Sequence, residues 1–511
     1  MNTGFDLFVV RVLVPIACII AIVQGFSWGL SEGRIALILA VVSLPLLFRL
    51  IGKPELFFIM VYVCISGNLT IPGIPQELML RDVIAMGLIG LMFFRFLLSK
   101  PPIRKEFGTA RLAGFALMAV IIVHIMVRGW GLRALSGELW GGMAYVRTFI
   151  AFGFFVASDL VLMTEKRWRQ LFTWSAISSF FPGLAQATFI MSGGKLYQQY
   201  MFVRIEAWAL RQSLYASSLS EGVVRYHFMS SIANAITMIG LTLSKWRYLP
   251  LVILISLPAA LISGFRSALL IQLMILVLFA IFYSSQDRVK RLGLIMVTIF
   301  VGLLFLAPFA RSLPLSFQRT LSIIPFYHIS EIAREDAFGT VEWRVDIWRI
   351  MLKNIPDYLF IGRGFAAESS LYSTLDPSYA SSPEFAYYVH NYHNGPLGML
   401  LDLGIVGLIS VTIFIVSSAI EAIKYKKLFA GDNFMNRYYC YLISVYLSQV
   451  IMFFVFFGDT ISYVPSMMFS LALIKVIIRT RIVEFAAQEK EKIEPASVMN
   501  EGHAVRFLNI V

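Results

Sequence analysis

Long apolar runs, separated by short polar segments, extend along nearly the whole chain. Many of these runs contain about 17 residues or more, which is enough for a helix to cross a hydrocarbon layer about 30 Å thick. The pattern therefore predicts an all-α fold, a polytopic transmembrane bundle of about 14 spans. The expected spans lie near residues 7–26, 34–51, 55–71, 82–98, 110–127, 144–163, 169–192, 226–244, 248–263, 266–284, 291–310, 396–420, 437–457 and 461–480.

Two of these spans, at 248–263 and 266–284, are separated only by the short stretch Ser263-Gly264-Phe265-Arg266. A single helix of about 37 residues across both would be too long for a bilayer, even if it were tilted. The sequence therefore predicts a tight reversal of the chain at this stretch.

The composition agrees with a membrane protein. Hydrophobic residues make up 58% of the 511 positions and charged residues only 14%, whereas soluble domains carry about 25% charged residues. The net charge of +13 does not predict a nucleic-acid partner, because Lys and Arg cluster in short loops between apolar runs. All three cysteines lie inside apolar runs, so neither a disulfide framework nor a metal site is expected.

The basic residues occupy alternate loops, and this orients the chain. The loops between them, at 27–33, 72–81 and 458–460, are poor in Lys. Since cytoplasmic loops are enriched in Lys and Arg, both termini are expected in the cytoplasm, in agreement with an even number of spans. The basic segments lie near 49–53, 100–105, 166–167, 245–247, 288–291, 424–427 and 479–492.

Four parts of the chain follow from this topology. Residues 1–310 are expected to form about 11 spans with a long outer segment at 193–225. Residues 311–395 form a large outer loop, residues 396–481 form about three further spans, and residues 482–511 form a charged, flexible or surface-lying cytoplasmic tail. Outer segments of this length usually carry function.

The outer loop 311–395 is rich in arginine. It contains nine acidic and seven basic residues. Arg offers paired planar donors that suit phosphate or carboxylate groups, and it stays charged in a poorly hydrated site. The alternative is that these side chains pair with local acids on a solvated helix face. The basic residues are Arg311, Arg319, Arg334, Arg344, Arg349, Lys353 and Arg363.

Residues 341–354 of this loop have the periodicity of an amphipathic helix, of a kind that often lies at the membrane surface. A glycine turn follows at residues 361–365, without the spacing of a phosphate-binding P-loop. The expected apolar face of the helix carries Trp343, Ile347, Ile350 and Met351, with Trp348 at its margin.

Two histidines close the loop. His390 and His393 lie three residues apart, just before Pro396, which suits the first turn of a helix. Histidine accepts a proton near neutral pH, so the pair is either catalytic or an interfacial hydrogen-bonding motif. A metal site is not favoured, because no third ligand stands at a matching spacing.

Three stretches of the chain carry spaced motifs. The first is His393-Asn394-x-x-Leu397-x-x-Leu400-x-x-x-Gly404-x-x-Gly407. The second is Ser263-Gly264-Phe265-Arg266-Ser267-Ala268, and the third is Arg344-x-x-x-Trp348 followed by Gly362-x-Gly364-Phe365. In this order they resemble the signature, the turn between spans and the segment ahead of the histidine in the O-antigen ligase and O-antigen polymerase superfamily. The resemblance covers roughly residues 260–410.

The resemblance implies a multi-pass enzyme of the bacterial inner membrane that needs no metal or cofactor. Its donor would be an undecaprenyl-pyrophosphate-linked glycan and its acceptor a sugar on the periplasmic face, with membrane lipids and a chain-length regulator as further candidate partners. His393 would deprotonate or orient the acceptor hydroxyl, and Arg266 and Arg344 would stabilise the departing pyrophosphate. The expected substrate-binding residues are His390, Asn394, Arg211, Arg225 and Arg363.

Several functions remain open at this point. Polymerisation of O-antigen or exopolysaccharide repeat units is favoured by the count of about 14 spans, since the ligases considered have fewer. Ligation of glycan to lipid A core, or transfer to a protein acceptor, is the alternative. A polysaccharide or lipid-linked-sugar transporter would need charged residues along its mid-span path, where the expected spans are largely bare. A receptor or scaffold without catalysis is the third class.

Overall fold

The computed structural model of the chain describes residues 53–70, 79–98, 106–130, 139–192, 203, 223, 225–283, 287–324, 327–365, 367–368, 382–431, 433–456 and 458–497. The expected spans at 7–26 and 34–51, and nearly all of the expected outer segment 193–225, lie outside these residues.

Helices make up most of the described chain. Its first helices are α4 (Pro54–Gly67), α5 (Leu80–Leu98), α6 (Gly108–Arg128), α8 (Met143–Ala157), α9 (Glu165–Ser178), α10 (Phe181–Met191), α12 (His227–Leu243) and α13 (Leu249–Ile262). The others are α14 (Arg266–Tyr283), α15 (Arg288–Leu306), α16 (Leu315–Leu321), α17 (Glu331–Tyr358), α19 (Pro383–Tyr388), α20 (Gly395–Lys424), α21 (Phe434–Ile451) and α22 (Thr460–Ser497).

Short elements join these helices. The tight helical turns are η2 (Ser158–Leu160), η4 (Trp246–Tyr248), η5 (Ala307–Ser312), η7 (Tyr425–Leu428) and the π-helical η8 (Met452–Phe456). Two strands of two residues each, β1 (Leu139–Trp140) and β2 (Ala367–Glu368), pair antiparallel and are a small departure from the all-α expectation.

Seven of the described helical segments are long and apolar enough to cross a membrane. Three shorter helices, at Pro54–Gly67, Phe228–Leu243 and Leu249–Ile262, are also apolar. A helical membrane protein is thereby confirmed, and the number of about 14 spans stays a prediction. The seven segments are Gly108–Arg128, Met143–Leu160, Arg266–Tyr283, Arg288–Ser312, Gly395–Leu428, Phe434–Phe456 and Thr460–Gln488.

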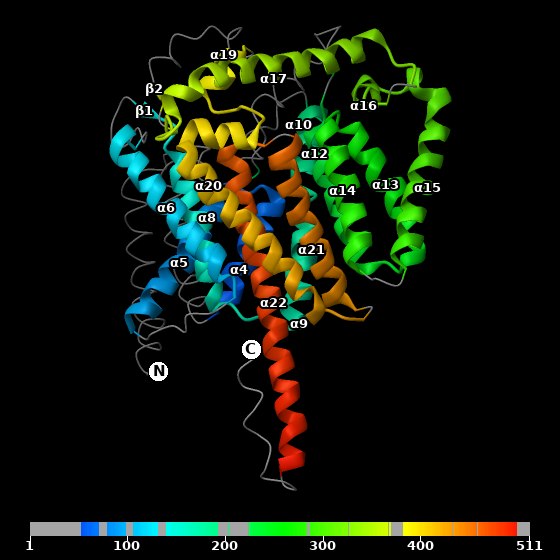
Figure 1. Cartoon of the computed structure of the whole chain (residues 1–511). Helices are drawn as coiled ribbons and strands as arrows, with labels where there is room; N and C mark the ends of the chain where they lie inside the picture. Colours follow the sequence, from blue (N-terminus) through cyan, green and yellow to red (C-terminus); the bar gives the residue numbers. More distant parts are fainter. Residues whose placement is uncertain are drawn as a thin grey trace, which may run out of the picture.

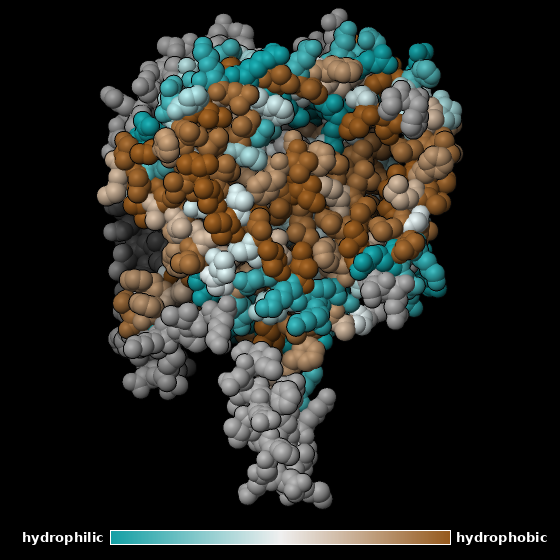
Figure 2. Space-filling model, in the orientation of Figure 1, coloured by the Kyte–Doolittle hydropathy of each residue, from teal (hydrophilic) through white to brown (hydrophobic). Residues whose placement is uncertain are grey.

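The two ends of the helical bundle differ. α17 lies across one end, and α22 extends from the other end toward the C-terminus (Figure 1). A broad apolar band separates the two polar ends (Figure 2), as expected where lipid tails surround the helices. α14 crosses this band from Arg266, on the side of α17, to the basic start of α15 on the opposite side.

Two predicted segments differ from the helices observed. The span expected at 169–192 is divided into α9 and α10, because Pro182 in the first turn of α10 has no N–H to continue the hydrogen-bond ladder. Residues 482–497 continue α22 as a helix, where a flexible or surface-lying tail was expected. This extension is rich in the strong helix formers Glu, Lys, Ala and Gln, and its Glu484 pairs with Arg481, just before it, at 2.8 Å.

A buried cation ties α22 to the first half of the bundle. Lys475 is 2% exposed, and its Nζ lies 2.7 Å from the Asp159 carboxylate and 3.0 Å from the Phe155 carbonyl oxygen. Arg111 of α6 donates to the same carboxylate at 2.9 Å. Because a buried charge is costly without a partner, these contacts hold the three helices in one arrangement. Lys475 lies inside the span expected at 461–480, although the middle of the expected spans is largely without charged residues.

A bend at Gly404 divides α20, with φ 68° and ψ −174° at this residue. The part after the bend has roughly 20 residues, which matches the thickness of the hydrocarbon layer. The bend exposes the carbonyl oxygens of Leu401 and Asp402, which accept hydrogen bonds from the backbone N–H groups of Arg363 and Gly364 at 2.9 Å. The predicted glycine turn after α17 is thereby joined to α20.

Gly404→Ala is expected to lower the stability of the protein severely. A Cβ at this position would lie 2.3 Å from the Phe360 carbonyl oxygen, and its φ is rarely adopted by residues with a side chain. The backbone strain alone costs about 1–3 kcal/mol. The yield and thermal midpoint in detergent measure the effect. Gly293→Ala is the control, because a Cβ there meets nothing within 4 Å; similar behaviour of the two variants would contradict the prediction.

Candidate active site

The predicted reversal between two spans is present and forms one wall of a cleft. α13 ends at Ile262, α14 begins at Arg266, and Gly264 between them has a left-handed φ of 75°. The cleft has a volume of about 1310 Å³, larger than the roughly 300–1,000 Å³ of a site for a drug-sized ligand. The charged side chains and the histidine that line it are Arg225, Arg266, Arg319, Asp336, Arg344 and His393.

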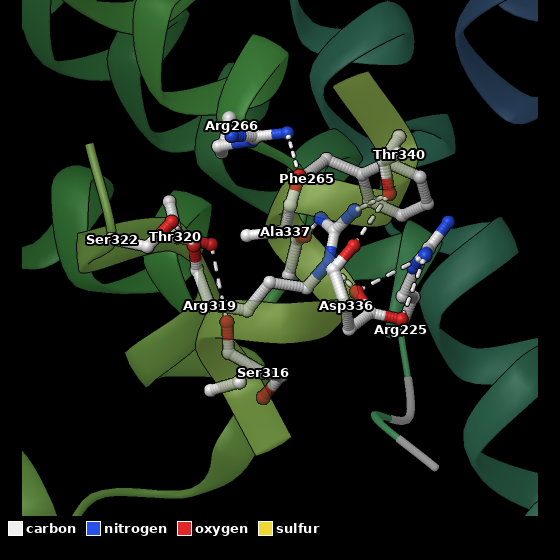
Figure 3. A network of polar contacts seen from close by, with 12 residues as sticks. Arg225, Phe265, Arg266, Ser316, Arg319, Thr320, Ser322, Asp336, Ala337 and Thr340 are labelled. Atoms are coloured by element: carbon white, nitrogen blue, oxygen red, sulfur yellow. Dashed lines mark hydrogen bonds and ion pairs between the residues drawn. The ribbon is translucent and has the colours of Figure 1, made fainter. Parts of the chain in front are cut away.

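One carboxylate organises the arginines. Asp336 pairs with Arg225 at 3.3 Å and with the Nε of Arg319, so the two guanidinium groups reach it from two sides (Figure 3). Arg319 is only 3% exposed, and it also donates to the Thr340 hydroxyl at 2.9 Å and to the Gly264 carbonyl oxygen. Arg319 therefore joins α16, α17 and the reversal turn.

The two arginines assigned to the pyrophosphate by the resemblance, Arg266 and Arg344, both line this cleft. Arg266 donates to the Ala337 carbonyl oxygen at 2.9 Å, which is a neutral partner. Burial lowers the pKa of Arg344 to about 10, and the charges of Arg266, Arg319 and Arg225 add to the effect. At neutral pH Arg344 is therefore still protonated.

The cleft carries an excess of positive charge. Four guanidinium groups face it against one carboxylate, which leaves a net charge of +3 among its described lining residues. The pKa of Arg225 is lowered first by burial and then by the charge of Arg319, so the cations repel one another. An anion with two or more charges would relieve this repulsion and accept several hydrogen bonds.

His393 lies beside these cations and is held as a neutral ring. Its backbone has a left-handed φ of 52°, and its ring centroid lies 5.5 Å from that of Trp343. Burial, followed by the charge of Arg344, lowers the pKa of His393 to about 4. Near neutral pH the ring is therefore neutral, which is the form of histidine that accepts a proton.

Beyond the cations, the cleft continues along an apolar wall. Leu269, Leu270 and Leu273 of α14 line it, together with Phe456 of η8. Leu273 follows Arg266 by seven positions, which places it about 10 Å deeper toward the apolar band. The cleft is therefore suited to a ligand in which a charged group is joined to hydrocarbon.

Three of the other predicted site residues, His390, Asn394 and Arg363, do not line this cleft. His390 is buried, with its Nδ1 2.8 Å from Oδ1 of Asp402, and Arg363 donates to its Nε2 at 3.2 Å. Asn394 caps α20 by accepting a backbone hydrogen bond from Leu397 at 3.1 Å. The remaining predicted residue, at position 211, lies outside the described residues.

Not all arginines of the predicted outer loop 311–395 face the cleft. Arg334 pairs with Glu331 at 3.4 Å and Arg349 pairs with Asp346 at 2.7 Å, each on the exposed face of α17. Local pairing, the alternative to ligand binding, therefore holds for these two. The apolar face expected on this helix is confirmed at Ile347, which is fully buried.

Two charged residues of the cleft, Arg319 and Asp336, were given no role of their own from the sequence. Arg319 was one of seven basic residues of the loop without a role of its own, and Asp336 had none. The partners of Asp336 lie 17 and 111 positions away, at Arg319 and Arg225. Such a pairing leaves no local signal in the sequence.

Among the described residues, no three His, Cys, Asp or Glu side chains gather as a metal site, and metal independence stays a prediction.

Residues 251–412 match a family model described as O-antigen ligase. The matched segment begins in α13 and ends in α20, so it includes every charged lining residue of the cleft except Arg225. The predicted resemblance to the O-antigen ligase and polymerase superfamily is confirmed. No curated protein matches the chain.

The family match indicates a membrane enzyme that transfers lipid-linked glycans in general. It supports the enzyme hypothesis over the transporter and the scaffold.

Proposed function

We propose that this chain, whose residues 251–412 match the O-antigen ligase family, is a glycosyltransferase acting on an undecaprenyl-pyrophosphate-linked oligosaccharide. One observation carries the proposal: four guanidinium groups and His393 face a single cleft whose wall continues as apolar side chains of α14. A pyrophosphate joined to a polyprenyl chain has the same succession of charge and hydrocarbon. We place the reaction at the periplasmic face of the bacterial inner membrane, opposite the basic loops.

The reaction needs one nucleophile and one leaving group. The acceptor hydroxyl oxygen attacks the anomeric carbon of the donor sugar, and the bond from that carbon to the pyrophosphate oxygen breaks. The polyprenyl pyrophosphate leaves with the electron pair, and Arg266 and Arg344 stabilise its charge. The proton of the acceptor hydroxyl passes to a ring nitrogen of His393.

Binding of the donor also changes the pKa of His393, the proposed base. Without an anion in the cleft, burial and the charge of Arg344 hold the pKa of His393 at about 4, so the ring is a weak base. A pyrophosphate bound at Arg344 offsets that charge, and the pKa of His393 rises toward the working pH. The histidine thus becomes an effective base when the donor is in place.

We propose polymerisation of O-antigen or exopolysaccharide repeat units as the reaction, because about 14 spans are expected. Under this proposal the acceptor is a growing glycan, and a chain-length regulator is a candidate partner. Ligation of the glycan to lipid A core is the second candidate, favoured by the description of the matched family.

Deletion of the gene distinguishes the two reactions. If the chain is a polymerase, the ladder of surface polysaccharide lengths collapses to a single repeat unit, and the wild-type gene restores it. If it is a ligase, polymer disappears from lipid A while lipid-linked polymer accumulates. An unchanged ladder together with unchanged lipid-linked glycan would overturn the proposed function.

A further inference from the structure

A buried network lies behind His393 and takes no part in the chemistry above. Asp402 of α20 is 0% exposed; its Oδ1 accepts a hydrogen bond from the Tyr392 hydroxyl at 2.7 Å and lies 2.8 Å from Nδ1 of His390. The Nε of Arg363 lies 3.5 Å from the same oxygen. Within the described part of the chain, the lining of the cleft includes none of these four side chains.

The turn held by this network has an uncommon backbone. His390 (φ 62°) and His393 (φ 52°) are both in the left-handed region, which costs on the order of 1 kcal/mol for each residue. Such a turn persists only where its surroundings hold it. On one side of His393, Trp348 donates to the Tyr392 carbonyl oxygen at 2.9 Å. On the other side, Asn394 caps α20 at 3.1 Å.

Asp402 is itself held on a rigid element. It precedes the bend at Gly404, and its carbonyl oxygen accepts a hydrogen bond from the backbone of Gly364 at 2.9 Å. Its second carboxylate oxygen, Oδ2, is buried with no hydrogen-bond partner among the described residues. Burying a carboxylate with one unsatisfied oxygen lowers the stability of the fold, and an apolar side chain at this position would pack at a lower free-energy cost. This cost is explained if the carboxylate orients the turn beside it.

We propose that Asp402 is a positioning residue for glycan transfer: through His390 and Tyr392 it holds the turn at residues 389–394, so that the ring of His393 meets the acceptor hydroxyl. The inference rests on the proposed function and adds to it a residue that contacts neither substrate. Proton transfer needs the ring within hydrogen-bond reach, and a displacement of about 1 Å costs about 100-fold in rate.

The anion site does not depend on this network. Arg266 and Arg344 come from α14 and α17, and Arg319 joins α17 to the reversal turn just before α14 through Asp336, Thr340 and the Gly264 carbonyl oxygen. Loss of Asp402 should therefore impair the catalytic step and leave pyrophosphate binding in place. A general structural role would impair both together.

Asp402→Asn in the full-length protein tests the proposal. This variant keeps the side-chain volume and an acceptor for Tyr392, and it removes the charge beside Arg363. We expect kcat to fall by about 10- to 100-fold at an unchanged KM for the lipid-linked donor. Inorganic pyrophosphate should still raise the thermal midpoint as it does for the wild type.

A chemical probe reports on the turn directly. Diethyl pyrocarbonate modifies neutral histidines, and mass spectrometry compares the rate at His393 with that at His328, an exposed histidine of the same outer loop. Release of the turn in Asp402→Asn should raise the modification rate of His393 relative to His328. An unchanged ratio would argue against a positioning role.

Tyr392→Phe provides a second variant if Asp402→Asn does not fold. It removes one hydrogen bond to Asp402 and keeps the buried ring, so a loss of about 10-fold in kcat at unchanged KM is expected. Wild-type kcat in either folded variant would overturn the proposal, and so would parallel loss of kcat and of the pyrophosphate response. An inactive His393→Ala beside a fully active Asp402→Asn would overturn this inference alone, whereas a fully active His393→Ala would overturn the proposed function.

Discussion

Replacing His393 with alanine is expected to reduce glycan transfer by about 100- to 10,000-fold, the usual contribution of a general base. The protein should still insert and fold, because the turn is anchored by the residues on either side and the His393 ring is only partly buried. Transfer of labelled repeat units from the lipid-linked donor in purified membranes measures the effect. Full activity of this variant would remove His393 from the mechanism.

Two comparisons sharpen the test of His393. His328→Ala changes an exposed histidine of the same outer loop and should retain activity. His393→Gln keeps a hydrogen-bonding side chain without a titrating ring, so recovery of activity in this variant would show that the residue orients the acceptor and does not take its proton.

The pH dependence has a defined direction. Because the pKa of His393 is lowered to about 4 in the absence of donor, kcat/KM should stay constant near neutral pH and fall as the pH approaches about 4. Donor binding raises this pKa, so the acid limb of kcat should lie at a higher pH than that of kcat/KM. His393→Gln should lack both limbs.

Replacing Arg266 with alanine is expected to reduce transfer by about 100- to 1,000-fold, because one donor to the departing pyrophosphate is lost. The thermal midpoint of this variant without ligand should not fall. Arg266 contributes repulsion that lowers the pKa of Arg344, and its hydrogen bond is to a neutral carbonyl oxygen. Its removal leaves the cleft less positive.

Ligand-induced stabilisation separates binding from folding for Arg266. Inorganic pyrophosphate should raise the thermal midpoint of the wild type and do so much less in Arg266→Ala. Arg349→Ala is the matched control, since Arg349 is an exposed arginine of the same outer loop whose pair with Asp346 contributes little. An undiminished pyrophosphate response in Arg266→Ala would place the anion elsewhere.

Local features account for the predicted residues that lie at the reversal turn and in the cleft. Gly264 and Arg266 were identified because a polar break between two apolar runs requires a reversal. His393 was identified by its position just before Pro396, where α20 begins, and by its place in a family signature. Each of these inferences depends on residues that are neighbours in the chain.

Spatial pairing accounts for the differences. His390 and Arg363 were expected to bind substrate; in the structure they contact the buried carboxylate of Asp402 and do not line the cleft. The two residues lie 27 positions apart and meet only because the bend at Gly404 opens α20 to the glycine turn. Neither hydrophobic periodicity nor a local motif predicts a contact between residues so far apart in the chain.

By itself, the sequence determined that this protein is a helical membrane protein with an arginine-rich segment and a histidine at the start of a span. Hydrophobic period and local charge are properties of short stretches, so they can be read without coordinates. Only the tertiary structure decided which arginines share the cleft with His393 and which pair elsewhere. That outcome depends on distances in space, which the reversal at Gly264 and the bend at Gly404 set.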